Sequence, residues 1–186
     1  MSRFIVSDTP IAGVKLVQRQ PLEDKRGFFG RVFCVQDLAH AGWNKPLAQI
    51  DQTLTRQRGT VRGLHYQQAP HADMKLVSCL RGVVWDVVVD LRAGSPTFLR
   101  WHAQALSADN HCAMLIPEGC AHGFQSLCDD AELLYCHSMP YVPKADAGLN
   151  PLDERLDIPW PLPVAMLSER DARHPMVDAR FAGVRA

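Results

Sequence analysis

The sequence predicts an all-β fold, built either as an antiparallel barrel or as an antiparallel sandwich. Short runs rich in Val, Leu, Phe and Tyr recur along most of the 186 residues. Gly, Pro, Asp and Asn separate these runs, as at 93–96 and 117–119. Little helical periodicity lies between them. Many short strands at this spacing are typical of closed or two-sheet antiparallel folds.

The expected elements follow one another along the chain. Strands or strand pairs are predicted at 14–17, 27–35, 49–55, 61–67, 75–80, 83–91, 97–106, 112–116, 123–127 and 132–139. A helical turn is expected at 36–42, and a short helix at 167–173 with Ser168 as its N-cap. The proline-rich segment 140–163 is expected to cross the surface without regular structure. We expect one domain over residues 1–186, with about 176–186 loosely ordered.

The strand expected at 83–91 has two unlike faces. Trp85, Val87 and Val89 fall on one face, because side chains alternate along a strand. Asp86 and Asp90 fall on the other face, among further valines. This pattern indicates a barrel with an apolar outer surface and a partly polar interior.

The composition excludes several classes of function. Lys plus Arg number 20 and Asp plus Glu number 20, so no overall charge favours nucleic acid or an anionic membrane surface. No signal peptide and no membrane-spanning run is evident, and we expect a cytoplasmic protein. The six cysteines form no CxxC pair and are expected to be reduced, which makes a zinc cluster improbable.

Polar residues within the predicted strands are the candidates for chemistry. Arg62, His65 and Gln67 lie in RGTVRGLHYQ, where the Gly63 kink can redirect Arg62. A surface arginine and a hydrogen-bonded core histidine are the commonplace explanation. Further polar residues along the chain weaken that explanation: Lys75, His122, Tyr135 and Asp171.

Each of these four residues also has a structural explanation. A strand edge is the commonest place for a strand lysine such as Lys75, and packing in the core is the usual role of a strand tyrosine such as Tyr135. His122 lies between two glycines and would suit a surface turn. Asp171 matters only if the C-terminal segment folds back over the barrel mouth. A metal site is not expected, because His65 is followed by Gln67 rather than by a second histidine, and because Lys75 would repel a cation.

The chain resembles the dTDP-4-dehydrorhamnose 3,5-epimerase family of the cupin superfamily. The matching stretches occur in the family's order and span nearly the whole chain: DKRGFFGRVF (24–33), RGTVRGLHYQ (58–67), KLVSCLRGVVWDVVVDLRAGSPTF (75–98), IPEGCAHGFQSL (116–127), ELLYCHSMPY (132–141), IPWP (158–161) and LSERDARHP (167–175). The resemblance implies a cupin-type jelly-roll barrel with short peripheral helices. It also implies a homodimer that exchanges strands, a nucleotide-linked 4-keto-sugar as substrate, and no cofactor.

The resemblance further implies a role for each candidate. His65 would be the base, oriented by Asp171, and Tyr135 the acid on the opposite face of the sugar. Lys75 would stabilise the enolate. The expected substrate-binding residues are Arg62, Gln52, Gln67, His122 and Tyr141, with Arg26 and Phe29 supplied by the neighbouring subunit.

Elementary chemistry agrees with these roles. A carbon beside a ketone loses its proton because the charge moves to the ketone oxygen as an enolate. Neutral histidine accepts a proton near pH 7, and a carboxylate on its other nitrogen fixes the tautomer. A cation near the oxygen lowers the barrier by about a few kcal/mol. Inversion at C3, at C5 or at both then needs a donor on the other face, and no electron carrier.

The chain departs from the family at four positions. Ile50 and Leu54 replace polar residues before RGLH, and Gln52 replaces an asparagine. Arg31 stands where a glutamate is expected. If these positions read the substrate, they predict a divergent epimerase acting at a single position, a less hydroxylated sugar, or a CDP-sugar. The alternatives are a 4-keto-sugar isomerase, a non-catalytic sugar-nucleotide-binding barrel and a metal-dependent dioxygenase, the last disfavoured by the ligand pattern.

Overall fold

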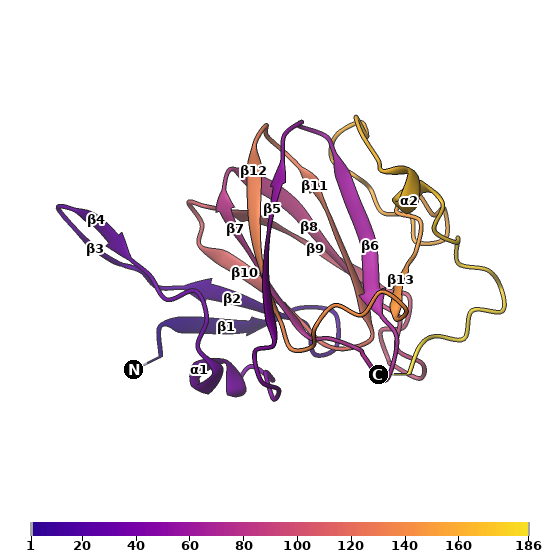
Figure 1. Cartoon of the computed structure of the whole chain (residues 1–186), viewed down its shortest axis with the longest axis horizontal. Helices are drawn as coiled ribbons and strands as arrows, with labels where there is room; N and C mark the ends of the chain where they lie inside the picture. Colours follow the sequence, from indigo (N-terminus) through magenta and orange to yellow (C-terminus); the bar gives the residue numbers. More distant parts are fainter. Residues whose placement is uncertain (1, 186) are drawn as a thin grey trace.

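The computed structural model describes residues 2–185 and contains two antiparallel sheets packed face to face (Figure 1). The first sheet has the order β1 (Phe4–Asp8), β2 (Lys15–Arg19), β10 (Cys112–Ile116), β7 (Lys75–Arg81), β12 (Ala131–His137) and β5 (Gln49–Thr55). The second has the order β13 (Asp146–Gly148), β6 (Val61–Gln67), β11 (Cys120–Ser126), β8 (Val83–Asp90) and β9 (Trp101–Ser107). This arrangement confirms the all-β jelly-roll prediction.

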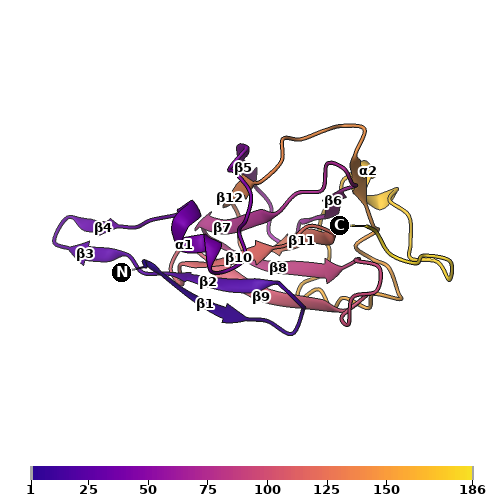
Figure 2. The same cartoon turned by 90° about the horizontal axis from the view of Figure 1, so that it is seen from below.

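The remaining elements are small and peripheral. A hairpin of β3 (Leu22–Asp24) and β4 (Gly27–Phe29) projects away from the barrel (Figures 1 and 2). Helix α1 spans Val35–Ala39, and α2 spans Glu169–Ala172 with Ser168 as N-cap, as predicted. Within residues 2–185, neither helix is long or apolar enough to cross a membrane.

Three predicted strands have the predicted bounds, and others differ for local reasons. The strands at 49–55, 61–67 and 112–116 are β5, β6 and β10. The run 27–35 is divided, because β4 ends at Phe29 and α1 begins at Val35. The run 97–106 forms a strand only from Trp101, since a turn precedes it. Strands β1, β3 and β13 were not predicted, because each is short and lacks clear alternation.

The main core fills the space between the sheets. Residues from both sheets interdigitate there, including Val77 and Leu133 from one sheet and Val84, Val88 and Phe124 from the other, all at most 1% exposed. Asp86 and Asp90 lie on the same inward face of β8 and are fully buried, as the alternation predicted. Apolar packing therefore holds the sheets together at one end of the barrel and leaves room for polar groups at the other.

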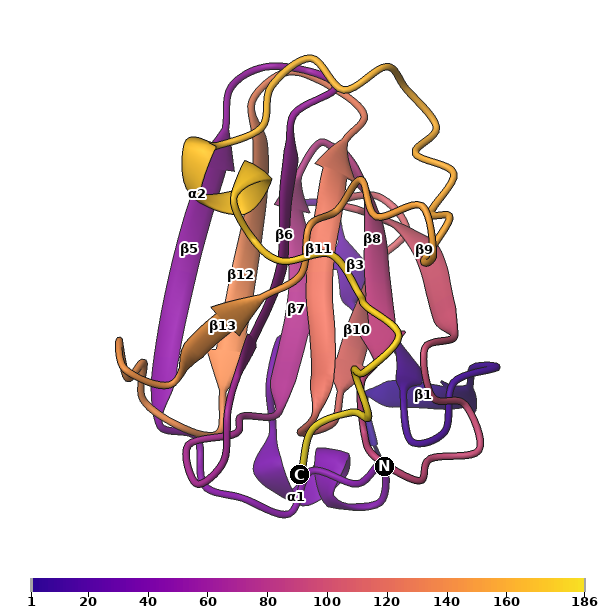
Figure 3. The ribbon, with the colours of Figure 1, turned by 90° about the vertical axis from the view of Figure 1, so that its right-hand side faces the viewer.

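The outer faces of both sheets are covered as well. Helix α1 and Trp43 pack over the first sheet against Leu76 and Leu115. The C-terminal segment crosses the outside of the second sheet (Figure 3) and packs on Val87 and Val89. That segment was expected to be loosely ordered, whereas Val177 is 3% exposed. Bridges pair Thr60 with Met166 before α2 and Arg92 with Val184 after it, so the segment is held on both sides of α2.

Two glycines allow β6 and β11 to approach closely. Gly63 has φ +121°, and a Cβ there would lie 2.6 Å from the Gly123 Cα atom. The register shifts at this point, with His122 opposite His65 but Phe124 opposite Arg62. This bulge turns Arg62 and His65 toward the same cavity, although regular alternation would separate them.

Candidate active site

One cavity of about 520 Å³ opens between the two sheets at the end covered by α2. Strands β6 and β11 form one wall, and β5, β7 and β12 form the opposite wall. Met166, Leu167 and Ser168, which precede α2, close part of the rim. Seven predicted residues line the cavity together with Asp171 from α2: Arg62, His65, Gln67, Lys75, His122, Tyr135 and Tyr141.

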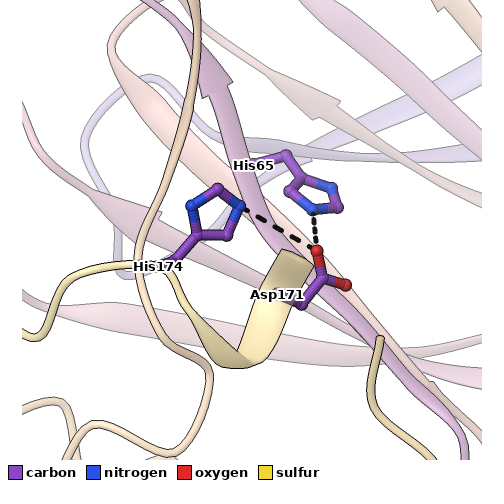
Figure 4. Close-up of side chains that lie close together, drawn as sticks. All are labelled: His65, Asp171 and His174. Atoms are coloured by element: carbon purple, nitrogen blue, oxygen red, sulfur yellow. Dashed lines mark hydrogen bonds and ion pairs between the residues drawn. The ribbon is translucent and has the colours of Figure 1, made fainter. Parts of the chain in front are cut away.

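His65 and Asp171 form a hydrogen-bonded pair in this cavity (Figure 4). The distance from His65 Nε2 to Asp171 Oδ1 is 2.7 Å. Asp171 Oδ2 accepts a second hydrogen bond from the Gly63 N–H at 3.2 Å. An ionised carboxylate only accepts, so in neutral His65 the proton lies on Nε2 and Nδ1 is unprotonated. Among residues 2–185, no group hydrogen-bonds that Nδ1.

The surroundings of Asp171 keep it ionised. Burial by itself would raise the pKa of Asp171, but hydrogen bonds from His65 and Gly63 and the contact with Ser168 hold that pKa below its ordinary value. The N-cap bond from the Asp171 N–H to Ser168 Oγ measures 3.0 Å and fixes the carboxylate at the start of α2. The C-terminal segment therefore does fold back over the mouth and supplies a fixed negative charge to His65.

A second imidazole, His174, stands beside this pair (Figure 4). Its Nε2 lies 3.9 Å from Asp171 Oδ1, and its ring meets the His65 ring edge-on with centroids 5.7 Å apart. Burial and the neighbouring His65 lower the pKa of His174, which favours its neutral form. The ligand atoms of these three residues lie within 4.8 Å of one another, a spacing that a metal ion could use. The 2.7 Å distance between His65 and Asp171, and the hydrogen bond from the Gly63 N–H to Asp171, are those of a hydrogen-bonded pair.

Tyr135 reaches the same cavity from the opposite sheet. It lies on β12, and its ring packs edge-on against His122, with centroids 5.9 Å apart. His122 is the cross-strand partner of His65 on β11. Burial raises the pKa of the Tyr135 phenol well above its ordinary value, so the group stays protonated and can donate. The base-like imidazole and the phenol thus belong to facing walls of one cavity.

His122 is held from behind by a fully buried carboxylate. Its Nε2 lies 2.6 Å from Asp86 Oδ1. Burial raises the pKa of Asp86, although the contact with His122 acts in the opposite direction. Asp86 Oδ2 is buried and has no hydrogen-bond partner in residues 2–185. The sequence predicted an inward Asp86 on β8, but not that it would orient His122.

Lys75 contributes an inward-facing ammonium. It begins β7 and is 8% exposed. Its Nζ donates to the His65 carbonyl at 3.4 Å and lies 3.9 Å from Asp73 Oδ2. The prediction of a lysine inside the barrel therefore holds, rather than one at an exposed strand edge.

The other expected binding residues are engaged in different ways. Arg62 Nε donates to Thr55 Oγ1 at 3.0 Å, which sets its guanidinium at the cavity wall. Gln67 braces the loop after β12 by accepting from the Val142 N–H at 2.7 Å and donating to the Pro140 carbonyl at 3.2 Å. Tyr141 also lines the cavity and is half exposed, with its ring available at the rim.

Three predicted pocket positions on β5 require correction. Gln49, Asp51 and Thr53 line the cavity, because odd-numbered residues of this strand face inward. Ile50 and Leu54 therefore lie on the outer face, where they are exposed. Gln52 shares that face and donates to Glu132 Oε2 at 3.0 Å.

The hairpin residues also lie outside the cavity of their own chain. Arg26 pairs with Asp24, and Phe29 is 77% exposed. Arg31 forms an exposed ion pair with Asp37 at 2.7 Å. Neither Arg31 nor the outer positions of β5 contact the cavity of this chain. The expectation of an unusual sugar or nucleotide therefore stays a prediction, which depends on how these residues lie in an assembly with a second subunit.

Several cavity residues were not anticipated from the sequence. Asp51, Asp73, His137 and Asp146 all line it, and His174 lies beside it. The alternation of β5 and β12 could have placed Asp51 and His137 on the same face as Tyr135. Asp73 and His174 lie outside regular alternation, and only the folded chain brings them in.

Comparison with known proteins identifies the family of this chain. A family model described as dTDP-4-dehydrorhamnose 3,5-epimerase matches residues 8–179. The chain belongs to the dTDP-4-dehydrorhamnose 3,5-epimerase family. A dTDP-4-dehydrorhamnose 3,5-epimerase from Sinorhizobium fredii is 40% identical over 166 residues, which cover 89% of this chain and 85% of that relative.

Solved structures agree with the family. A dTDP-4-dehydrorhamnose 3,5-epimerase from Bacillus anthracis, with TDP and PPi bound, is 36% identical, has a TM-score of 0.90 and is matched over 94% of this chain and 99% of that one. A 3'-monoepimerase from Streptomyces bikiniensis, in complex with dTDP-quinovose, is 35% identical with a TM-score of 0.83, over 90% and 85% of the two chains. As a member of the dTDP-4-dehydrorhamnose 3,5-epimerase family, the chain is an isomerase that acts on a nucleotide-linked sugar.

Proposed function

We propose that the chain inverts C3, C5 or both in a dTDP-linked 4-keto-6-deoxy sugar, through an enolate. The observation that carries the proposal is that His65 and Tyr135 line one cavity from opposite sheets, with Lys75 on the same wall as Tyr135. Relatives named as 3,5-epimerases and as a 3'-monoepimerase support both the substrate class and the choice of carbons.

The reaction follows from the protonation states of the site. His65 Nδ1 takes the proton from the carbon beside the ketone, and the electron pair of that bond forms the enolate. Asp171 stabilises the resulting imidazolium, as a carboxylate does behind a catalytic histidine. The Lys75 ammonium stabilises the developing charge on the ketone oxygen.

Tyr135 completes the inversion. Its phenol delivers a proton to the opposite face of the same carbon, and the enolate returns to the ketone. Because the pKa of Tyr135 is raised, the phenol is protonated before this step. A proton leaves one face and another arrives at the other, so no net electron transfer occurs and no redox cofactor takes part.

The nucleotide is bound at the rim of the cavity. Arg62 offers a guanidinium suited to a diphosphate, because its planar donors match phosphate oxygens. Tyr141 presents a half-exposed ring against which a base can stack. His122, held by Asp86, faces the sugar between His65 and Tyr135.

We also propose a homodimer in which the β3–β4 hairpin reaches the partner's cavity. The hairpin projects from the barrel, and Phe28 and Phe29 are 61% and 77% exposed. Such large exposed aromatic side chains are typical of an interface. Light scattering should give twice the chain mass of 20.8 kDa, and Phe29→Ala should raise KM for the sugar nucleotide. A monomeric mass would contradict this arrangement.

Solvent exchange tests the proposed chemistry directly. Incubation with dTDP-4-dehydro-6-deoxyglucose in deuterated water should place deuterium at C3, at C5 or at both, as read by NMR. His65→Asn should abolish this exchange. Tyr135→Phe should preserve exchange but abolish inversion, because His65 still works on its own face.

The control is His40→Asn, which changes an exposed histidine after α1 and should leave the rate unchanged. If His65→Asn exchanged deuterium as fast as this control, the assignment of the base would be incorrect. If the unmodified protein bound the sugar nucleotide without exchange, the non-catalytic binding function would replace the enzymatic one.

A further inference from the structure

A second cluster of charged groups lies on the cavity wall opposite the His65–Asp171 pair. His137 Nδ1 lies 2.9 Å from Asp73 Oδ2, and His137 Nε2 lies 3.4 Å from Asp51 Oδ2. The same Asp73 oxygen is 3.9 Å from Lys75 Nζ. The exposed fractions of the Asp73 and Lys75 side chains are 3% and 10%. Asp73 and Lys75 are therefore buried, and the cluster connects directly to the ammonium group of the site.

The sheet register explains why these residues meet. His137 and Lys75 are cross-strand partners where β12 ends and β7 begins. The Met74 N–H donates to Ser138 Oγ at 2.8 Å, and the Ser138 N–H donates to the Met74 carbonyl at 3.0 Å. Met74 is anchored in the outer core beneath α1, so its neighbours at 73 and 75 both turn inward.

Lys75 needs this cluster because of where it lies. An ammonium carries three donors, and Lys75 gives one to the His65 carbonyl. A buried cation without an anionic partner is costly. Asp73 is the carboxylate near Nζ, and at 3.9 Å it balances the charge without holding the ammonium in a short hydrogen bond. The remaining donors of Lys75 are thus available to a substrate oxygen.

His137 holds Asp73 in place and also contacts Tyr135, the proposed acid. Its Nδ1 bond at 2.9 Å fixes the carboxylate. Its ring stacks on Tyr135, with centroids 5.9 Å apart and planes inclined by 15°. One imidazole therefore orders the counter-ion of Lys75 and one face of the Tyr135 ring.

We propose that Asp73 is a positioning residue that balances the charge of the Lys75 ammonium and keeps it directed at the ketone oxygen, and that His137 fixes Asp73 for this purpose. The inference rests on the proposed function, because it gives Lys75 the role of stabilising the enolate. The substrate group that this cluster recognises is the ketone oxygen of the 4-keto-sugar, which carries the negative charge of the enolate.

The first test is Asp73→Asn in the full-length protein. It removes the charge beside Lys75 but retains the shape and an acceptor for His137. We expect kcat for deuterium exchange to fall by tenfold or more, with KM within threefold of the unmodified protein. The matched control is Asp153→Asn, a buried carboxylate remote from the cavity that bonds the Arg155 and Val177 N–H groups. The control should lower Tm while leaving kcat within threefold.

A second pair of variants separates the hydrogen bond from the stacking. His137→Asn keeps a donor near the position of Nδ1 and should retain at least half of kcat. His137→Phe keeps an aromatic ring beside Tyr135 but removes the donor, and should resemble Asp73→Asn. A merely structural role predicts the reverse order, because Phe packs better than Asn in that place.

The outcomes separate this inference from the proposed function. If the unmodified protein exchanges no deuterium, the proposed function fails. If it does exchange deuterium, an unchanged or increased kcat in Asp73→Asn overturns the positioning role. This holds even if the Tm of that variant falls. A kcat higher in His137→Phe than in His137→Asn would also overturn it.

Discussion

Replacing Asp171 by Asn should inactivate the enzyme through the tautomer of His65. The Gly63 N–H donates to one oxygen of Asp171, so the amide oxygen of the asparagine would occupy that position. The amide nitrogen would then face His65 Nε2, 2.7 Å away in the native pair, and would donate to it. His65 must in that case carry its proton on Nδ1, the nitrogen that faces the substrate.

The magnitude follows from the loss of the free nitrogen. The same exchange of Asp for Asn behind a histidine costs about 10⁴ in kcat where the wrong tautomer is fixed. We expect a loss on the order of 10³ to 10⁴ here, or roughly 4–5.5 kcal/mol of transition-state stabilisation. Asp171→Ala imposes no tautomer and should retain more activity than Asp171→Asn.

The assay is deuterium incorporation beside the ketone, followed by NMR at saturating sugar nucleotide. Glu169→Gln is the matched control, because Glu169 lies on the same helix, is 86% exposed and pairs with Arg173 alone among residues 2–185. It should leave kcat unchanged. If Asp171→Asn kept a tenth of the native kcat, or exceeded Asp171→Ala, fixation of the tautomer by Asp171 would be refuted.

The remaining predictions concern stability. Gly63→Ala should lower the free energy of unfolding by about 3 kcal/mol or more, because φ is +121° and the new Cβ would lie 2.6 Å from the Gly123 Cα atom. A loss below about 1 kcal/mol in urea unfolding would contradict this prediction. Leu106→Ala should cost about 2–5 kcal/mol because Leu106 is fully buried, whereas Leu152→Ala, at a side chain 48% exposed, should cost far less in the same experiment. Burial by itself would raise the pKa of Asp90, but bonds from Arg92, Ser95 and Thr97 lower it to about 2. As pH falls, the unfolded chain binds this proton before the folded chain does. The stabilisation is therefore complete above the ordinary Asp pKa of 3.8 and is lost as pH falls toward about 2. Asp90→Asn should remove that part of the pH dependence in acid unfolding titrations.

Much of the fold could be read from local patterns. Strands β5, β6 and β10 were predicted with their observed bounds, because runs of alternating or apolar residues end at clear turn signals. Ser168 was identified as an N-cap from its residue type and position. Strand β13 was missed because it exists only through pairing with β6, and a three-residue element leaves no periodic signal.

The outward placement of Ile50 and Leu54 shows where sequence comparison misled. Both replace polar residues, and the substitution pattern alone suggested a changed pocket. A strand has two faces, and only the observed sheet shows that positions 49, 51 and 53 face the cavity. The choice between the faces depends on which side of β5 the second sheet covers, and this is a tertiary property.

The sequence by itself determined the family and the all-β class. It also determined the residue types for removing a proton from carbon, for donating a proton and for stabilising the enolate. These depend on motifs and on alternation, which act over a few residues. The family resemblance implied the pairing of Asp171 with His65, and the structure shows it. Only the tertiary structure decided that Asp86 supports His122, and that Asp73 and His137 meet Lys75. The physical reason is that sheet register and the path of the C-terminal segment are set by packing between elements far apart in the chain.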